Sequence, residues 1–398
     1  MKKSLLYILF EAIAKGGPQV FLLMVVAQTA SYDNLLLFIS LEGLLALLFC
    51  SNYVEVIYSL NDKYAPKKVL DTIFSANLIS LLFLGLIALI GYPWIAEHYE
   101  YDNPLTYILI ILVSFFIITY RFTVVKHQVN EDHNTALTLK FVPFMLSFLF
   151  SMAGYLLIED EFLGYYLGKA GGFTIAFIVF INKLKFKFFQ FDMNILKDYL
   201  SRIKRLIIIY VTGWLSGYGY LNIVKDSVDE ATLSEMGYVL NLFTIFLLVS
   251  NGINQVFVPK LRKIYLNENT KALGFANKFH VLYFAVAGIA LLVYKGVANF
   301  VDIEIVQKYV SYFCWACLIF VMASFDYVSK PFYMIVDKYN RFMNINILSN
   351  VLGFSLLIFA IFVLQSKEII YIYICFNGIK FLTPYLDVRI NRKSVFGK

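Results

Sequence analysis

The chain has 398 residues, of which 60% are hydrophobic and 15% charged, and its mean hydropathy is +0.71. A soluble globular protein carries about 25% charged residues, so this composition excludes a soluble globular domain and indicates a polytopic membrane protein. We assign the net charge of +7 to membrane topology rather than to nucleic-acid binding, because most of the basic residues fall in alternate loops.

Apolar runs long enough to cross a bilayer as helices recur about twelve times along the chain. They lie near 5–28, 34–57, 70–92, 105–126, 141–158, 162–183, 206–224, 234–258, 276–297, 306–329, 342–365 and 368–388. We therefore predict an all-α polytopic membrane protein with about 12 transmembrane helices, arranged as two six-helix halves around a central cavity. The halves are residues 1–183 and 206–398, joined by a basic cytoplasmic linker over 184–205.

The distribution of charge fixes the predicted orientation. With the amino end placed in the cytoplasm, 27 of the 34 Lys and Arg residues fall in cytoplasmic segments and four in outer loops, which are acidic instead. This asymmetry is the positive-inside pattern. It predicts a multi-pass protein with both termini in the cytoplasm.

The first span is broken and charged. Glu11 and Lys15 lie within it, and Gly16, Gly17 and Pro18 follow directly. A charge at membrane depth costs about 2.5–3.5 kcal/mol on insertion scales, and Pro18 cannot donate to the carbonyl four residues before it. We expect Gly16, Gly17 and Pro18 to form a hinge, with Glu11 in gating or ion coupling and Lys15 facing a polar interior.

Two further lysines inside spans are the main candidates for an anion site. Lys169 and Lys380 each lie in the last span of a half, beside glycines, and neither has an acid four residues away. An unpaired ammonium in a cavity attracts phosphate as a point charge. We predict that Lys169 and Lys380, together with Lys15, bind substrate; the alternative for Lys169 and Lys380 is snorkelling to the interface.

The acidic residues inside spans suggest coupling or structural pairing. Glu42 is mid-span without a local partner, so it either pairs with Lys15 or is a protonatable site that couples transport to a proton gradient. Asp326 and Lys330 are four residues apart near the inner end of the tenth span. We expect them to form a structural ion pair, with gating or ion coupling as the alternative role.

Aromatic residues are interleaved with small ones from Gly213 to Tyr220 in the seventh span. The mixture suits a cavity wall that stacks on sugars, and it is equally typical of ordinary helix packing. The chain shows no phosphate-binding glycine loop, no Ser/His/Asp arrangement and no metal-spaced cluster, so we expect neither an enzyme nor a cofactor or metal site.

A possible internal repeat relates the two halves. The segment from Ser51 to Ile57 corresponds to the segment from Ser250 to Val256, which lies 199 residues later. Both segments follow a Leu/Phe-rich span and precede a basic loop. Two six-span halves of the same orientation would enclose a cavity about an axis along the membrane normal, which is a transporter architecture.

The full-length pattern resembles the Wzx-type polysaccharide repeat-unit flippases of the multidrug/oligosaccharidyl-lipid/polysaccharide exporter superfamily. The resemblance rests on the twelve spans, the two halves, the basic linker and the broken first span. Local matches add Met236-Gly237-Tyr238, Val256 to Leu261, Ser329 to Tyr333 and Asp337-Lys338-Tyr339. No motif fixes the alignment finely enough to transfer individual residues.

The resemblance implies a bacterial inner-membrane flippase. It would move undecaprenyl-pyrophosphate-linked oligosaccharide units, for O antigen (lipopolysaccharide) or capsule, from the cytoplasmic to the periplasmic leaflet by alternating access, coupled to an ion gradient. Its partners would be that polyprenyl-pyrophosphate-linked oligosaccharide, membrane lipid, and a polysaccharide polymerase with its chain-length regulator. Two alternatives remain open: a small-molecule or drug exporter of the same superfamily, and a polysaccharide polymerase, which the short outer loops disfavour.

Overall fold

The computed structural model describes residues 16–18, 20–22, 32–49, 56, 60, 63–129, 132–184, 190–215, 217–267, 269–300, 310–335, 339–363 and 369–391. Nearly all of these residues are helical, and no strand occurs among them. This confirms the predicted all-α membrane fold. Glu11 and Lys15, two of the predicted site residues, lie outside the described residues.

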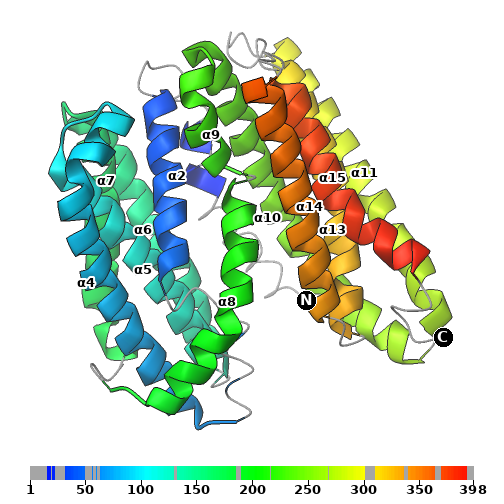
Figure 1. The fold of residues 1–398 in the computed structure, drawn as a ribbon, viewed down its shortest axis with the longest axis horizontal. Coiled ribbons are helices and arrows are strands. Elements are labelled where there is room, and N and C mark those ends of the chain that lie inside the picture. Colours follow the sequence, from blue (N-terminus) through cyan, green and yellow to red (C-terminus); the bar gives the residue numbers. More distant parts are fainter. Residues whose placement is uncertain are drawn as a thin grey trace. The chain divides into compact units, whose positions relative to one another are not determined.

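The chain forms two compact units, each a bundle of helices running side by side (Figure 1). The first unit contains the described residues up to Phe21 and those from Asn34 to Trp214. Its helices are α2 (Tyr32–Leu48, whose first two residues belong to the second unit), α4 (Pro66–Tyr99), α5 (Pro104–Val129), α6 (His133–Leu157), α7 (Glu161–Leu184) and α8 (Met193–Leu215, whose last residue belongs to the second unit).

The second unit contains Leu22–Asp33 and Leu215–Lys398, of which the described part is again helical. Its elements are α9 (Gly219–Val224), η3 (Lys225–Ser227), α10 (Glu230–Asn267), α11 (Asn269–Phe300), α13 (Val310–Ile335), α14 (Tyr339–Ile358), the π-helical turn η4 (Phe359–Val363) and α15 (Ile369–Ile390). Helix α13 packs against α10, α11 and α15, so it forms the centre of this unit.

Every predicted span from the second to the twelfth overlaps a described helix. By length and apolar composition, 7 described helices qualify as membrane spans, or up to 8 if the broken pair formed by α8 and α9 counts as one. The chain is therefore a multi-pass membrane protein. The count of twelve is consistent with these helices and stays a prediction.

Helix α4 shows burial that is the reverse of a water-soluble helix. Its polar residues Ser75 and Asn77 are 0% exposed, whereas Leu82 and Phe83 are 67% and 62% exposed. Apolar side chains on the outside and polar ones inside are expected where lipid, not water, surrounds the bundle, because polar groups in lipid need partners within the protein.

Helices α6 and α7 approach each other through glycines. A Cβ atom on Gly168 would overlap the backbone carbonyl of Phe150, and one on Gly172 would lie 2.6 Å from the carbonyl oxygen of Leu146. Close backbone contact through small residues is typical of helix packing in membranes. The glycines at 168 and 172, which flank Lys169, therefore serve helix packing, whereas a Cβ atom on Gly171 would meet open space.

The segment before the seventh span docks onto the first unit. The backbone amides of Gln190 and Asp192 donate to the hydroxyls of Ser75 (3.0 Å) and Thr72 (3.2 Å) in α4. Farther along, Asp198 accepts hydrogen bonds from Lys63 (2.6 Å) and Tyr64 (2.8 Å). Because of these contacts, the described part of the 184–205 segment belongs structurally with the first unit.

Candidate functional site

Lys169 of α7 is paired with Glu42 of α2. The Lys169 Nζ atom lies 2.7 Å from Glu42 Oε2, and the two side chains are 15% and 12% exposed. The same ammonium lies 5.3 Å and 5.7 Å from the ring centroids of Tyr165 and Tyr166. The two side chains form a hydrogen-bonded ion pair. The two tyrosine rings also attract the ammonium, because the face of an aromatic ring attracts cations.

The prediction that Lys169 is an unpaired ammonium is therefore wrong. Its acid lies 127 residues away in the sequence, so inspection of neighbours four residues apart could not find it. The first alternative for Glu42, a pair with Lys15, cannot be compared because Lys15 lies outside the described residues. The second alternative, that Glu42 is a protonatable site, stays open, and Lys169 is the residue with which Glu42 is paired.

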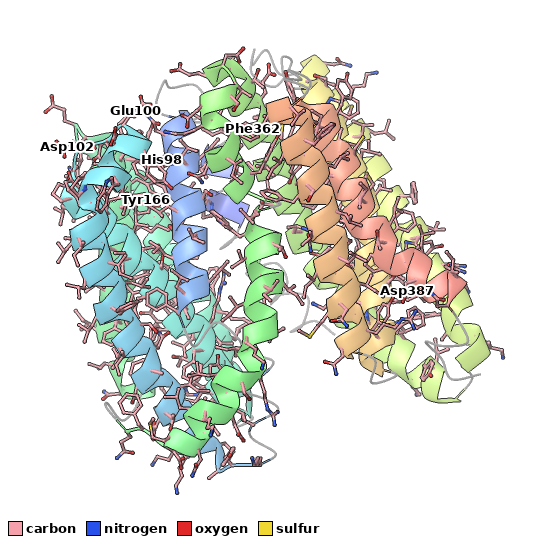
Figure 2. All side chains as sticks on the ribbon, viewed as in Figure 1. His98, Glu100, Asp102, Tyr166, Phe362 and Asp387 are labelled. Carbon is pink, nitrogen blue, oxygen red and sulfur yellow. The ribbon has the colours of Figure 1, made fainter. Side chains whose placement is uncertain are left out.

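An aromatic cluster centred on Phe38 adjoins this pair through Tyr166. Phe38 of α2 stacks on Tyr99 at 5.3 Å and meets Tyr101, Tyr107, Phe162 and Tyr166 edge to face. The hydroxyl of Tyr166 is buried, and no described residue hydrogen-bonds to it. Figure 2 shows Tyr166 within the first unit, deeper than Glu100 and Asp102 at the end of α4. No spacing in the sequence marks this cluster, because its rings come from separate segments of the chain.

Beside the cluster, Asp160 lies in the turn between α6 and α7. Its carboxylate accepts hydrogen bonds from the Tyr101 hydroxyl (2.8 and 2.6 Å), the Asn103 amide (3.1 Å) and the Leu163 backbone (3.0 Å). Burial alone would raise the pKa of Asp160, but these hydrogen bonds outweigh it and hold the pKa below its usual value. The group is therefore a carboxylate that fixes the turn.

In the second unit, Asp326 of α13 interacts electrostatically with Lys330 of the same helix and, to a smaller extent, with Lys380 of α15. The Lys380 ammonium also lies 5.2 Å from the centroid of the Phe381 ring. The Oδ1 atom of Asp326 is buried, and no described residue donates a hydrogen bond to it. A half-buried lysine thus lies near a carboxylate that has one oxygen without a hydrogen-bond donor among the described residues. Buried polar atoms normally have such a partner, so this oxygen is a candidate contact for a ligand.

The ion pair expected between Asp326 and Lys330 does not form among the described side chains. No Lys330 nitrogen lies within the 4.0 Å that defines such a pair, and the Lys330 ammonium lies 6.0 Å from the ring of Phe342 in α14 instead. Four-residue spacing places both on one face of α13, and Lys330 acts electrostatically on Asp326 without coming within ion-pair distance of it. The gating role predicted for both residues stays a prediction.

The aromatic stretch of the seventh span contributes to packing. Trp214 Nε1 donates to the Ser40 carbonyl (2.8 Å), and the fully buried Tyr220 stacks on Tyr373 at 5.4 Å. Tyr218 donates to Asn241 (2.5 Å), whose amide donates to Tyr32 (2.7 Å). These contacts favour ordinary helix packing over a sugar-stacking wall for Trp214 and Tyr220.

Gly16, Gly17 and Pro18, the predicted hinge, are helical in the described structure, and Gly16 is buried. A Cβ atom on Gly17 would lie 2.9 Å from Phe148 Cε1 of α6. Phe21, just beyond, meets Phe148 and Tyr155 edge to face. The described residues of the first span therefore pack on α6, and their role as a hinge stays a prediction.

The fold is similar to that of solved structures over almost the whole length of the chain. An inward-facing multidrug resistance MATE family transporter of the MOP superfamily matches with a TM-score of 0.73 and 15% identity, covering 99% of this chain and 96% of that one. The fold is that of a MATE transporter. A MATE in the straight conformation matches with a TM-score of 0.59 and 14% identity, over 99% and 93% of the two chains.

The sequence is also similar to a characterised protein. The capsular polysaccharide biosynthesis protein CapF of Staphylococcus aureus is 24% identical over 240 residues, which is 56% of this chain and 55% of that protein. The match thus spans about half the length of this relative. No protein-family model matches the chain.

Proposed function

We propose that the protein is a flippase that moves polyprenyl-pyrophosphate-linked oligosaccharide from the cytoplasmic to the periplasmic leaflet by alternating access. The observation that carries this proposal is the similarity to a capsular polysaccharide biosynthesis protein in a chain with a transporter fold. The protein then resides in the bacterial inner membrane with both termini in the cytoplasm, and it supplies a polysaccharide polymerase and its chain-length regulator.

Lys169 and Lys380 bind the pyrophosphate in this proposal. Both are half-buried lysines. Lys169 lies in a helix that is long and apolar enough to cross a membrane, and Lys380 lies in α15, within the predicted twelfth span; charged residues at membrane depth usually mark substrate or ion pathways. Lys15 assists from the first span. Glu11, Glu42, Asp326 and Lys330 act in gating or ion coupling, with energy from an ion gradient, and Gly16, Gly17 and Pro18 provide the bend.

The test is complementation of a deletion strain for surface polysaccharide. Lys169→Ala and Lys380→Ala should insert normally and lose most surface polysaccharide. Lys183→Ala, an exposed lysine at the end of the same helix α7, is the matched control and should complement fully. Full complementation by both test variants would remove these lysines from the proposal. A deletion strain that keeps its polysaccharide would refute the function itself.

Export of small molecules or drugs is a second candidate. It is favoured by the match over 99% of this chain to a multidrug resistance transporter and by the unmet acceptor on Asp326, because an acid suits a cationic substrate. Under this function, the deletion strain would become sensitive to cationic drugs while its surface polysaccharide stayed intact. Asp326→Asn would then abolish resistance, whereas Lys380→Ala would retain it.

A further inference from the structure

Glu42 and Lys169 satisfy each other in the described structure. The titratable groups around Glu42 are Lys169, Tyr165 and Tyr166 from α7, and Tyr99 of α4 lies beside Tyr166. From α5, Ser114 reaches only the Glu42 backbone carbonyl, at 3.2 Å. Among the described residues, no second cation lies within ion-pair distance of Glu42. Within the part of the chain that the structure describes, the Glu42 carboxylate is therefore paired with one ammonium, that of Lys169.

An anion that binds Lys169 competes directly with this carboxylate. The ammonium is a compact point charge with three donors, and Glu42 occupies it at 2.7 Å. A pyrophosphate carries more charge than one carboxylate, so it can replace Glu42. Removing one partner from a buried pair leaves an uncompensated charge, and such a charge is strongly unfavourable.

The displaced Glu42 carboxylate then stands beside a polyanion and aromatic rings. Like charge and poor solvation both disfavour the ionised form of a carboxyl group. Uptake of one proton from the solvent would remove this like charge and leave a neutral acid. A neutral carboxyl can also donate a hydrogen bond to the anion, which a carboxylate cannot do.

We propose that Lys169 exchanges partners during transport: an anionic pyrophosphate group replaces Glu42 on the ammonium, and Glu42 binds one proton. Release of the anion returns Lys169 to Glu42 and expels the proton. Anion binding and proton binding at this site are thus coupled one to one. The inference rests on the proposed function, because it requires an anionic substrate at Lys169.

The second half of the chain lacks this carboxylate at the related position. The 199-residue shift between the halves relates Glu42 to Asn241. The Asn241 amide cannot titrate, and it is already hydrogen-bonded to Tyr218 and Tyr32. Asn241 therefore adds no proton to the one that Glu42 binds when an anion occupies Lys169.

The test is isothermal titration of the full-length protein in lipid nanodiscs with inorganic pyrophosphate. Titrations at pH 7 in two buffers of different ionisation enthalpy give the number of protons taken up for each pyrophosphate bound. We expect wild type to take up one more proton than Glu42→Gln, since the protonation of pyrophosphate itself is common to both. Glu235→Gln in α10 is the matched control and should behave as wild type.

The affinities provide a second readout. Without the competing carboxylate, Glu42→Gln should bind pyrophosphate at least about fivefold more tightly at pH 7, and Lys169→Gln should lose binding. Wild type takes up one more proton on binding than Glu42→Gln does. For each unit by which the pH rises, its affinity for pyrophosphate should therefore fall about tenfold more than that of Glu42→Gln. Equal proton uptake, or equal pH slopes, in wild type and Glu42→Gln would overturn the exchange.

Infrared difference spectra of wild type alone keep the inference testable if Glu42→Gln does not fold. Adding pyrophosphate should produce the C=O stretch of a protonated carboxylic acid, and a spectrum without this band would refute the exchange. Pyrophosphate binding without proton uptake would refute the exchange and leave the flippase proposal standing. Absence of pyrophosphate binding in wild type would refute both the anion site at Lys169 and the exchange.

Discussion

The backbone of Gly168 in α7 lies so close to the carbonyl group of Phe150 in α6 that a Cβ atom at position 168 would overlap it. Gly171, one turn of the same helix away, faces open space. Substitutions at Gly168 and at Gly171 can therefore distinguish an effect on helix packing from an effect on the approach of substrate to Lys169.

Gly168→Ala should destabilise the first unit, because α7 must move away from α6. Overpacking of a tight interior costs about 1–3 kcal/mol. Gly171→Ala should be neutral or stabilising by up to about 1 kcal/mol, as for glycine replaced in a helix. Thermal unfolding midpoints of the purified variants in one detergent will check this. Equal midpoints for the two variants would show that the close contact is not required.

Neutralising one member of the Glu42–Lys169 pair should cost more stability than neutralising both. Glu42→Gln and Lys169→Gln each leave one buried charge without its partner, a loss of about 3–5 kcal/mol in buried pairs. The double variant should recover most of this stability and still lack transport. Unfolding and complementation measured on the same three variants will separate the structural from the functional role. A double variant as unstable as the sum of the two single variants would contradict a direct pair.

Asp160→Asn should weaken the outer end of the first unit at neutral pH. Hydrogen bonds to a charged acceptor contribute about 1.5–3 kcal/mol, and Asp160 accepts them from Tyr101, Asn103 and Leu163. Because folding lowers the pKa of Asp160, its contribution is complete above the usual carboxyl pKa of about 4 and disappears as the pH falls through the lowered value.

The difference in unfolding midpoint between wild type and Asp160→Asn should accordingly be large at pH 7 and shrink on acidification. Glu159→Gln changes the neighbouring acid and is the control, with a small effect at every pH. A difference that grows toward low pH would have the wrong sign for a carboxylate stabilised by hydrogen bonds.

Gly17→Ala tests the predicted hinge, provided its packing effect is removed. The new methyl group would lie 2.9 Å from the Phe148 ring, so a loss of transport could arise from a shifted α6. Phe148→Leu makes room for that methyl group. If the first span bends at Gly17, transport should fall in Gly17→Ala and stay low in Gly17→Ala/Phe148→Leu. Recovery in the double variant would assign the loss to packing, and no hinge would be needed.

The membrane class and the positions of the helices follow from local properties of the chain. Apolar length is a local property of the chain, so spans such as 105–126 and 162–183 match α5 and α7 closely. The unusual residues were also visible, because a lysine within an apolar run is conspicuous wherever its partner lies.

Only the tertiary structure decided what those residues contact. Glu42 and Lys169 are 127 residues apart, and no periodicity connects them. Conversely, Asp326 and Lys330 have the spacing of an ion pair, yet the lysine side chain lies near Phe342 of another helix. Spacing along one helix places residues on a common face, but partners in a bundle are chosen across helices, where the low-dielectric interior makes each buried charge depend on the nearest opposite one.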